Sequence, residues 1–248
     1  MLPLVSYWVV NYYSKKAVVM PRRYFYDDVS VIEKNGKKIP DTLWHRVKGP
    51  AFTDQFGRNV SIDQIKNRVI VLNFFFTRCP SICPGLTRNM KKLQDSFKGS
   101  DTLVHFMSVS VDPENDSTPQ LRQFADKFNV NHDNWWFVRG NPDEVYEFAL
   151  KEIKASIADT QVDTAFIHTE NFFLLDTTHV VRGWYNGFDQ QRLSRLAADI
   201  PLLMLEKDKK APKIFSRLIP ILPIIFVVIG MVIIVSIFLN RNRKEQRI

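Results

Sequence analysis

The residues of this chain best suited to chemistry lie in the stretch FFFTRCPSICPG, residues 74–85, which contains both of its cysteines. Cys79 and Cys83 are separated by three residues, and each is followed by a proline. Two thiols at this spacing could form a structural disulfide, act as a redox pair or ligate a soft metal ion. A disulfide would close a very short loop and gain little by the chain-closure argument, so we rank it lowest. The dithiol motif of thioredoxins is C-x-x-C, one residue shorter, which leaves redox exchange open.

A metal site needs a third ligand, and the five histidines are the candidates. His168 ends the loop that leads into the apolar segment NFFLLD, and if this segment is a strand antiparallel to residues 68–76, its start faces the cysteines. We expect His105 to be packed within a strand, and the remaining three to lie in turns or irregular chain: His45, His132 and His179. Two thiolates and one imidazole form a soft, low-coordinate set that suits copper, whereas zinc would require a fourth ligand.

The segments on either side of the cysteines predict the elements that position them. RVIVLNFFF, residues 68–76, is rich in β-branched and aromatic residues, as is typical of a strand buried on both faces. After the cysteines, apolar residues recur at helical spacing, at Leu86, Met90, Leu93 and Phe97. Cys79 is therefore expected just beyond a strand and before a helix, where sites form in open α/β sheets. The N-terminus of that helix would lower the pKa of the thiol.

The rest of the chain alternates between strand and helix patterns. We expect strands at 102–112 and 134–140, helices at 117–130, 141–153 and 188–207, and hairpins at 51–62 and 171–185. Residues 24–50 are expected to be irregular. In SVDPENDSTPQL we assign only structural roles, with Asp112-Pro113 ending a strand and Ser117 or Thr118 capping a helix. This order predicts an α/β fold with a thioredoxin-like central mixed sheet flanked by helices.

Charge and hydropathy indicate membrane attachment. Residues 218–239 are apolar and uncharged, which predicts a transmembrane helix between a basic linker at 207–217 and a basic cytoplasmic tail at 240–248. Residues 1–23 are expected to be a partial N-terminal membrane segment and linker. The formal net charge of +8 arises at these two ends, since residues 24–206 are net negative. The basic residues therefore do not indicate a nucleic-acid partner.

Four segments, DQFGRNVS, FFFTRCPSICPGLTRNM, SVSVDPENDSTPQL and IHTENFFLLD, in this order and spacing, resemble the Sco/SenC family of membrane-anchored copper proteins, which help to metallate the CuA site of cytochrome c oxidase. The resemblance covers roughly residues 50–200. It implies a thioredoxin-like domain, residues 24–206, on the extracytoplasmic (periplasmic) face of the inner membrane. It also implies copper ligation by Cys79, Cys83 and His168. Many members carry an acid between the cysteines and an aspartate before the histidine, where this chain has Ser81 and Ile167.

The function expected from this resemblance is non-enzymatic copper delivery to the CuA-bearing subunit of cytochrome c oxidase or to another cuproprotein. The alternative is a thiol-disulfide oxidoreductase that keeps the cysteines of an oxidase subunit reduced. In that case Cys79 and Cys83 would be the redox-active pair.

Overall fold

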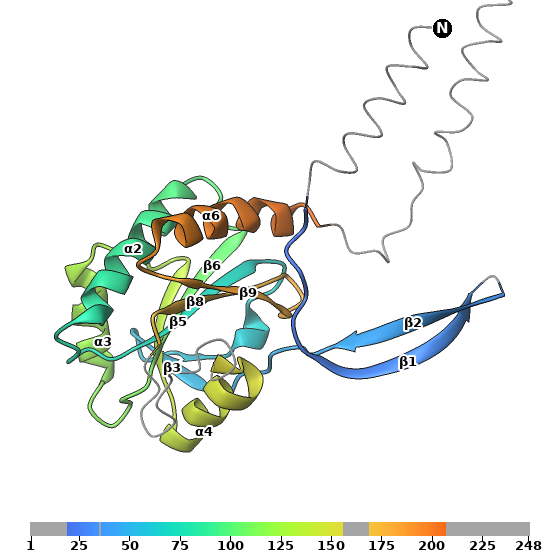
Figure 1. The fold of residues 1–248 in the computed structure, drawn as a ribbon. Coiled ribbons are helices and arrows are strands. Elements are labelled where there is room, and N and C mark those ends of the chain that lie inside the picture. The colour runs from blue at the N-terminus through green and yellow to red at the C-terminus, as the bar shows by residue number, and fades with distance from the viewer. Residues whose placement is uncertain (1–18, 35, 156–168, 207–248) are drawn as a thin grey trace, which may run out of the picture. The chain divides into compact units, whose positions relative to one another are not determined.

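The computed structural model describes residues 19–34, 36–155 and 169–206, and a seven-stranded mixed sheet lies at the centre of this part of the chain (Figure 1). Its strand order is β4-β3-β7-β6-β5-β8-β9. The three central strands are parallel to one another: β5 (Val69–Phe75), β6 (Val104–Ser110) and β7 (Trp135–Arg139). Antiparallel pairs flank them on both sides: β3 (Phe52–Asp54) with β4 (Asn59–Val60), and β8 (Asn171–Leu175) with β9 (Val181–Asn186). The predicted mixed α/β architecture is confirmed.

Helices cover both faces of this sheet. On one face lie α2 (Ile82–Ser96), α3 (Thr118–Lys127) and α6 (Gln190–Met204). The other face is covered by α4 (Pro142–Glu147) and the π-helical turn Phe148–Glu152 that continues it. Every residue of β5 and β6 is buried as a result, as the mainly apolar run at 68–76 predicts for β5.

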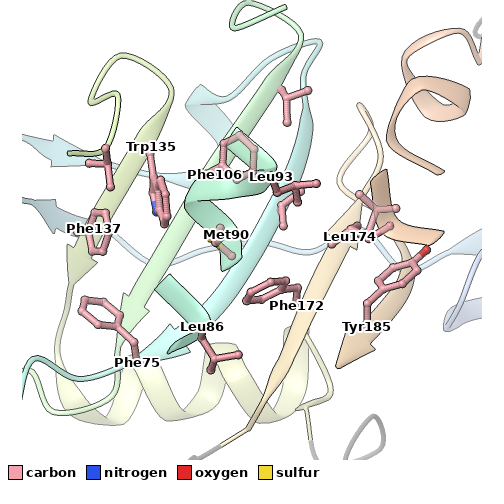
Figure 2. Close-up of a cluster of buried hydrophobic side chains, with 14 of the residues drawn as sticks. Phe75, Leu86, Met90, Leu93, Phe106, Trp135, Phe137, Phe172, Leu174 and Tyr185 are labelled. Atoms are coloured by element: carbon pink, nitrogen blue, oxygen red, sulfur yellow. The ribbon is translucent and has the colours of Figure 1, made fainter. Parts of the chain in front are cut away.

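The packing of α2 against the sheet fixes the helix that carries the second cysteine. Leu86, Met90 and Leu93 point from α2 towards aromatic side chains of the sheet, among them Phe75, Phe106 and Phe172 (Figure 2). Leu86 and Met90 are fully buried, which confirms that Met90 belongs to the core. The helical stripe read from the sequence is thus the contact face of α2.

Local sequence signals account for several of the turns and caps. Gly57 adopts a φ of 78° between β3 and β4, where glycine pays no steric cost. Ser117 caps α3 in a capping box with Gln120, and a proline follows in the first turn, so the predicted capping role is confirmed. The predicted strand at 102–112 is shorter in the structure, and the helix at 141–153 changes from α to π after Glu147.

The expectation that residues 24–50 are irregular is wrong for most of that segment. β1 (Tyr26–Lys34) and β2 (Lys37–Trp44) form a separate two-stranded antiparallel ribbon. The overlooked signal is the pair Asn35-Gly36, because Asn-Gly favours a tight hairpin turn, and Gly36 has a φ of 71°. At the base of the ribbon, the His45 N–H donates to the Phe25 carbonyl at 3.1 Å.

Within the described ranges, no helix combines the length and apolar character needed to cross a membrane. The predicted membrane helix at 218–239, its flanking segments and residues 1–18 lie outside these ranges.

Candidate metal centre

Cys79 and Cys83 lie where β5 ends and α2 begins. Cys79 belongs to the segment that connects these elements, and Cys83 lies in the first turn of α2. Both are free thiols, and their side chains are buried, with exposed fractions of 5% and 1%. The backbone N–H of Cys83 donates to Cys79 Sγ at 3.4 Å, and Ser81 Oγ lies 4.0 Å from the same sulfur. The predicted position beyond a strand and before a helix is confirmed.

The surroundings of the two thiols make them chemically unequal. Burial raises the pKa of Cys79, but hydrogen bonds from the Cys83 backbone and thiol, and from the Ser81 and Ile82 backbones, outweigh it and bring this pKa below its ordinary value. Burial raises the pKa of Cys83 to about 12, and its hydrogen bond to Cys79 and the negative charges of Cys79 and Asp116 act in the same direction. Cys79 therefore loses its proton more readily than Cys83, and the Cys83 thiol donates to it.

A buried carboxylate holds the segment that leads into Cys79. Asp116 is fully buried and accepts hydrogen bonds from the Thr77 hydroxyl at 2.5 Å, the Thr77 backbone N–H at 3.2 Å and the Ser110 hydroxyl at 2.5 Å. Next to it, Arg78 donates to Asp112 at 2.7 Å. The loop after β6 therefore does more than end a strand and cap a helix, because it also anchors the cysteine-bearing segment.

This role of Asp116 could not be predicted from the sequence. The side chain bonds across a separation of 39 residues to Thr77, so the contact exists only once β5 and β6 lie side by side. A single acid within the run DPENDST carries no local signal that distinguishes it from its neighbours Asp112 and Glu114.

The third predicted ligand, His168, lies outside the described residues, so its role stays a prediction. The described chain resumes at Thr169, which is buried, and continues into β8. β8 pairs antiparallel with β5, with Leu72 opposite Phe173. The predicted strand direction is confirmed, so β8 starts at the edge of the sheet where β5 ends and the segment with Cys79 begins.

The structure describes the other four histidines, and each makes polar contacts or is buried. His45 contacts Asp27 at 2.7 Å, His132 contacts Asp126 at 2.9 Å, and His179 Nε2 contacts the Ile65 carbonyl at 2.8 Å. His105 is buried within β6, as predicted. Among the residues that the structure describes, no three His, Cys, Asp or Glu side chains are grouped so as to hold a metal ion.

Comparisons with known proteins identify relatives of most of this chain. The model of the SCO1/SenC family matches residues 46–204. The SCO1 protein homolog of Bacillus subtilis is 36% identical over 166 residues, covering 66% of this chain and 86% of that protein.

Solved structures agree with this match. The structure of BsSco, a member of the Sco family of cytochrome c oxidase assembly proteins in which a disulfide switch was identified, is 36% identical. The superposition covers 67% of this chain and 98% of the BsSco chain, with a TM-score of 0.57. Arabidopsis thaliana ScoI with copper bound is 20% identical, covers 63% of this chain and 99% of that one, and has a TM-score of 0.50. At this identity the likeness shows the fold alone.

Proposed function

The chain belongs to the SCO1/SenC family, and from this premise we propose that it binds copper through Cys79, Cys83 and His168 and delivers it to another cuproprotein. The observation that carries the proposal is the pair of reduced, buried and chemically unequal thiols at the junction of β5 and α2. Copper is the cargo in this proposal, as befits a relative described as a member of a family of cytochrome c oxidase assembly proteins.

The donor set fits this cargo. Thiolates are soft ligands that favour copper(I), and Cys79 already has the lower pKa of the pair. Cys83 has to lose its proton before it can ligate, so loading releases protons and strengthens as the pH rises. His168 would complete a three-coordinate site from the start of the segment that feeds β8.

The recipient and the location are further parts of the proposal. We propose the CuA-bearing subunit of cytochrome c oxidase as the recipient and the periplasmic face of the inner membrane as the place of transfer. The domain organisation follows the sequence, with an extracytoplasmic domain at 24–206 held to the membrane by residues 218–239. This anchor would keep the copper site close to a membrane-embedded oxidase.

A thiol-disulfide reductase is the second candidate, and the unequal thiols favour it as well. The Cys79 thiolate would attack one sulfur of a substrate disulfide, forming a mixed disulfide and releasing one substrate thiolate. The sulfur of Cys83, once deprotonated, would then displace the second substrate thiolate and leave a Cys79–Cys83 disulfide. An external thiol reductant would have to restore the pair. The C-x-x-x-C spacing is one residue longer than the thioredoxin motif, which is why we rank metal delivery first.

Copper(I) competition against a chromophoric chelator tests the main proposal with the full chain purified in detergent. We expect Cys79→Ser, Cys83→Ser and His168→Ala each to weaken binding strongly, because each removes one ligand of a three-coordinate site. His132→Ala is the matched control, since that imidazole is engaged by Asp126 and should leave the affinity unchanged. Full retention of copper by His168→Ala would remove His168 from the site.

Two activities of the same preparation separate the candidates. A copper chaperone should transfer copper to an oxidase CuA domain and reduce insulin disulfides only slowly. Oxidation of the cysteine pair to a disulfide should block loading, and its reduction should restore it. Rapid insulin reduction without any copper transfer would make the reductase the better assignment.

A further inference from the structure

A second candidate site lies at the end of the sheet opposite the cysteines. A pocket of about 600 Å³ opens beside the amino ends of β6 and β7. Its walls come from the β3–β4 hairpin, the 3-10 turn Ile62–Gln64, the residues just before β5, and the starts of β6 and β7. No residue between β5 and α2 lines it. Its volume is that of pockets that bind small organic molecules.

The charged groups around this pocket are mainly cationic. Arg58, Lys66 and Arg68 line it, against one acid, Asp133. Arg58 is partly neutralised, because its Nε donates to the buried Asp54 carboxylate at 2.6 Å. Neither Lys66 nor Arg68 has an ion-pair partner within the described part of the chain. The pocket therefore offers an anionic ligand two cations, Lys66 and Arg68, that no acid of the described ranges pairs with.

A buried histidine in the wall lacks hydrogen-bond partners. His105 is only 1% exposed, and neither of its ring nitrogens has a partner among the described residues. Burial and the nearby charge of Arg68 lower its pKa to about 3, so the ring is neutral, with one nitrogen as donor and the other as acceptor. Buried polar groups without partners are rare in folded proteins because their desolvation is uncompensated. Packing alone does not explain a histidine here, since an apolar ring would fill the same space at lower cost.

Aromatic side chains supply the other part of the site. Trp136 lines the pocket and meets the His105 ring edge to face, with ring centroids 4.3 Å apart and an interplanar angle of 74°. Phe56 lines it as well, with the Arg58 guanidinium 4.9 Å from its ring centroid. These side chains offer apolar surface next to the cations, as a planar ligand with a charged group would require.

We propose that this pocket binds a small organic anion in which a carboxylate or phosphate group is attached to a planar ring. Arg68 and Lys66 hold the charged group, the guanidinium of Arg68 being suited to bidentate contact with carboxylate or phosphate oxygens. Trp136 and Phe56 contact the ring, and the neutral His105 supplies a hydrogen bond. Because the site shares no residue with the cysteine pair, it stands or falls independently of copper binding.

Equilibrium dialysis of the full chain in detergent tests this site with defined probes. Adenosine monophosphate represents a planar ring with a phosphate, and phthalate represents a planar ring with carboxylates. Adenosine and inorganic phosphate are the two separate halves of adenosine monophosphate. We expect saturable binding of at least one planar anion, weaker binding of either half, and weakening by added salt. The planar anion that binds more tightly identifies which oxyanion the site prefers.

Variants assign the binding to the pocket. Arg68→Gln should weaken binding of the planar anion by about tenfold or more, because it removes a charge-assisted hydrogen bond. Lys92→Gln makes the same charge change on the exposed side of α2 and should leave the affinity unchanged. His105→Phe keeps an aromatic ring in the wall and should weaken binding by about fivefold. Copper loading should be the same in all three variants.

Three results would overturn the proposal. The first is the absence of saturable binding by both planar anions up to millimolar concentration. The second is equal weakening by Arg68→Gln and Lys92→Gln, which would mean general charge attraction. The third is an unchanged affinity for the planar anion in both single variants, His105→Phe and Arg68→Gln, which would place the binding elsewhere on the protein.

Discussion

Replacing Asp116 by asparagine should loosen the segment that holds Cys79. The carboxylate accepts hydrogen bonds from two groups of Thr77 and from the Ser110 hydroxyl. An amide keeps one acceptor oxygen but turns its NH₂ group towards groups that are themselves donors. Hydrogen bonds to a charged group contribute about 1.5–3 kcal/mol each, so the loss of one or two of them should lower the free energy of unfolding by about 1.5–6 kcal/mol.

The same substitution should change the chemistry of the cysteine pair. The negative charge of Asp116 is one of the factors that raise the pKa of Cys83 to about 12. Removing this charge should lower the pKa of Cys83, so its alkylation by iodoacetamide should begin at lower pH than in the unmodified chain. Copper affinity at neutral pH should fall if the displaced segment no longer aligns the thiols, despite the easier deprotonation of Cys83.

Urea unfolding followed by tryptophan fluorescence and alkylation followed by mass spectrometry measure these two effects. Glu114→Gln is the matched control, because Glu114 is exposed and lies two residues away in the same loop. The reasoning is refuted if Asp116→Asn unfolds within about 0.5 kcal/mol of Glu114→Gln, the range expected of surface substitutions. An unchanged pH profile for Cys83 alkylation would refute the electrostatic part alone.

Three further results are expected. Leu86→Ala should destabilise the protein by about 2–5 kcal/mol in urea unfolding, because the Leu86 side chain is fully buried between α2 and the sheet. Lys92→Ala, at an exposed position of the same helix, should have little effect, and equal effects would contradict the packing of Figure 2. Iodoacetamide should modify Cys79 at lower pH than Cys83, since the pKa of Cys79 is lowered and that of Cys83 is raised to about 12; the reverse order of modification would contradict the assignment. Gly187→Ala should lower the unfolding midpoint, because a Cβ there would lie 2.4 Å from a Leu86 methyl group and 3.0 Å from the Glu170 carbonyl oxygen; an unchanged midpoint would mean that α2 shifts freely.

Elements dominated by short-range patterns could be predicted from the sequence. β5 follows from a mainly apolar run and the helical stripe of α2 from periodic apolar residues, and together they place Cys79 at their junction. The hairpins around Gly57 and His179 follow from turn residues between short apolar runs. Each of these signals is local, because burial on a sheet or a helix face is encoded within about ten residues of chain.

The features that were not predicted from the sequence involve either exposed strands or contacts between segments that are distant in the chain. The β1–β2 ribbon had a local turn signal in Asn35-Gly36, but its strands leave large apolar side chains exposed, such as Val31 at 67%, so their pattern does not alternate cleanly between a core face and a polar face. Asp116 meets Thr77 only in the folded sheet. The cationic pocket likewise draws its residues from four separate segments, so its charge balance has no counterpart in any one motif.

The unequal thiols alone do not separate copper delivery from disulfide reduction, because both mechanisms use Cys79 as the first thiolate and Cys83 as the second sulfur. The two mechanisms differ in whether they need a third group, the imidazole of His168. A soft cation held by two sulfurs gains a ligand from an imidazole, whereas disulfide exchange proceeds between sulfur atoms and requires no imidazole. His168→Ala is therefore the variant that distinguishes them: a chaperone should lose its copper affinity while its slow exchange with small disulfides stays the same. If both activities fall together, the histidine acts on the cysteine pair itself, and the three-ligand site is the wrong description.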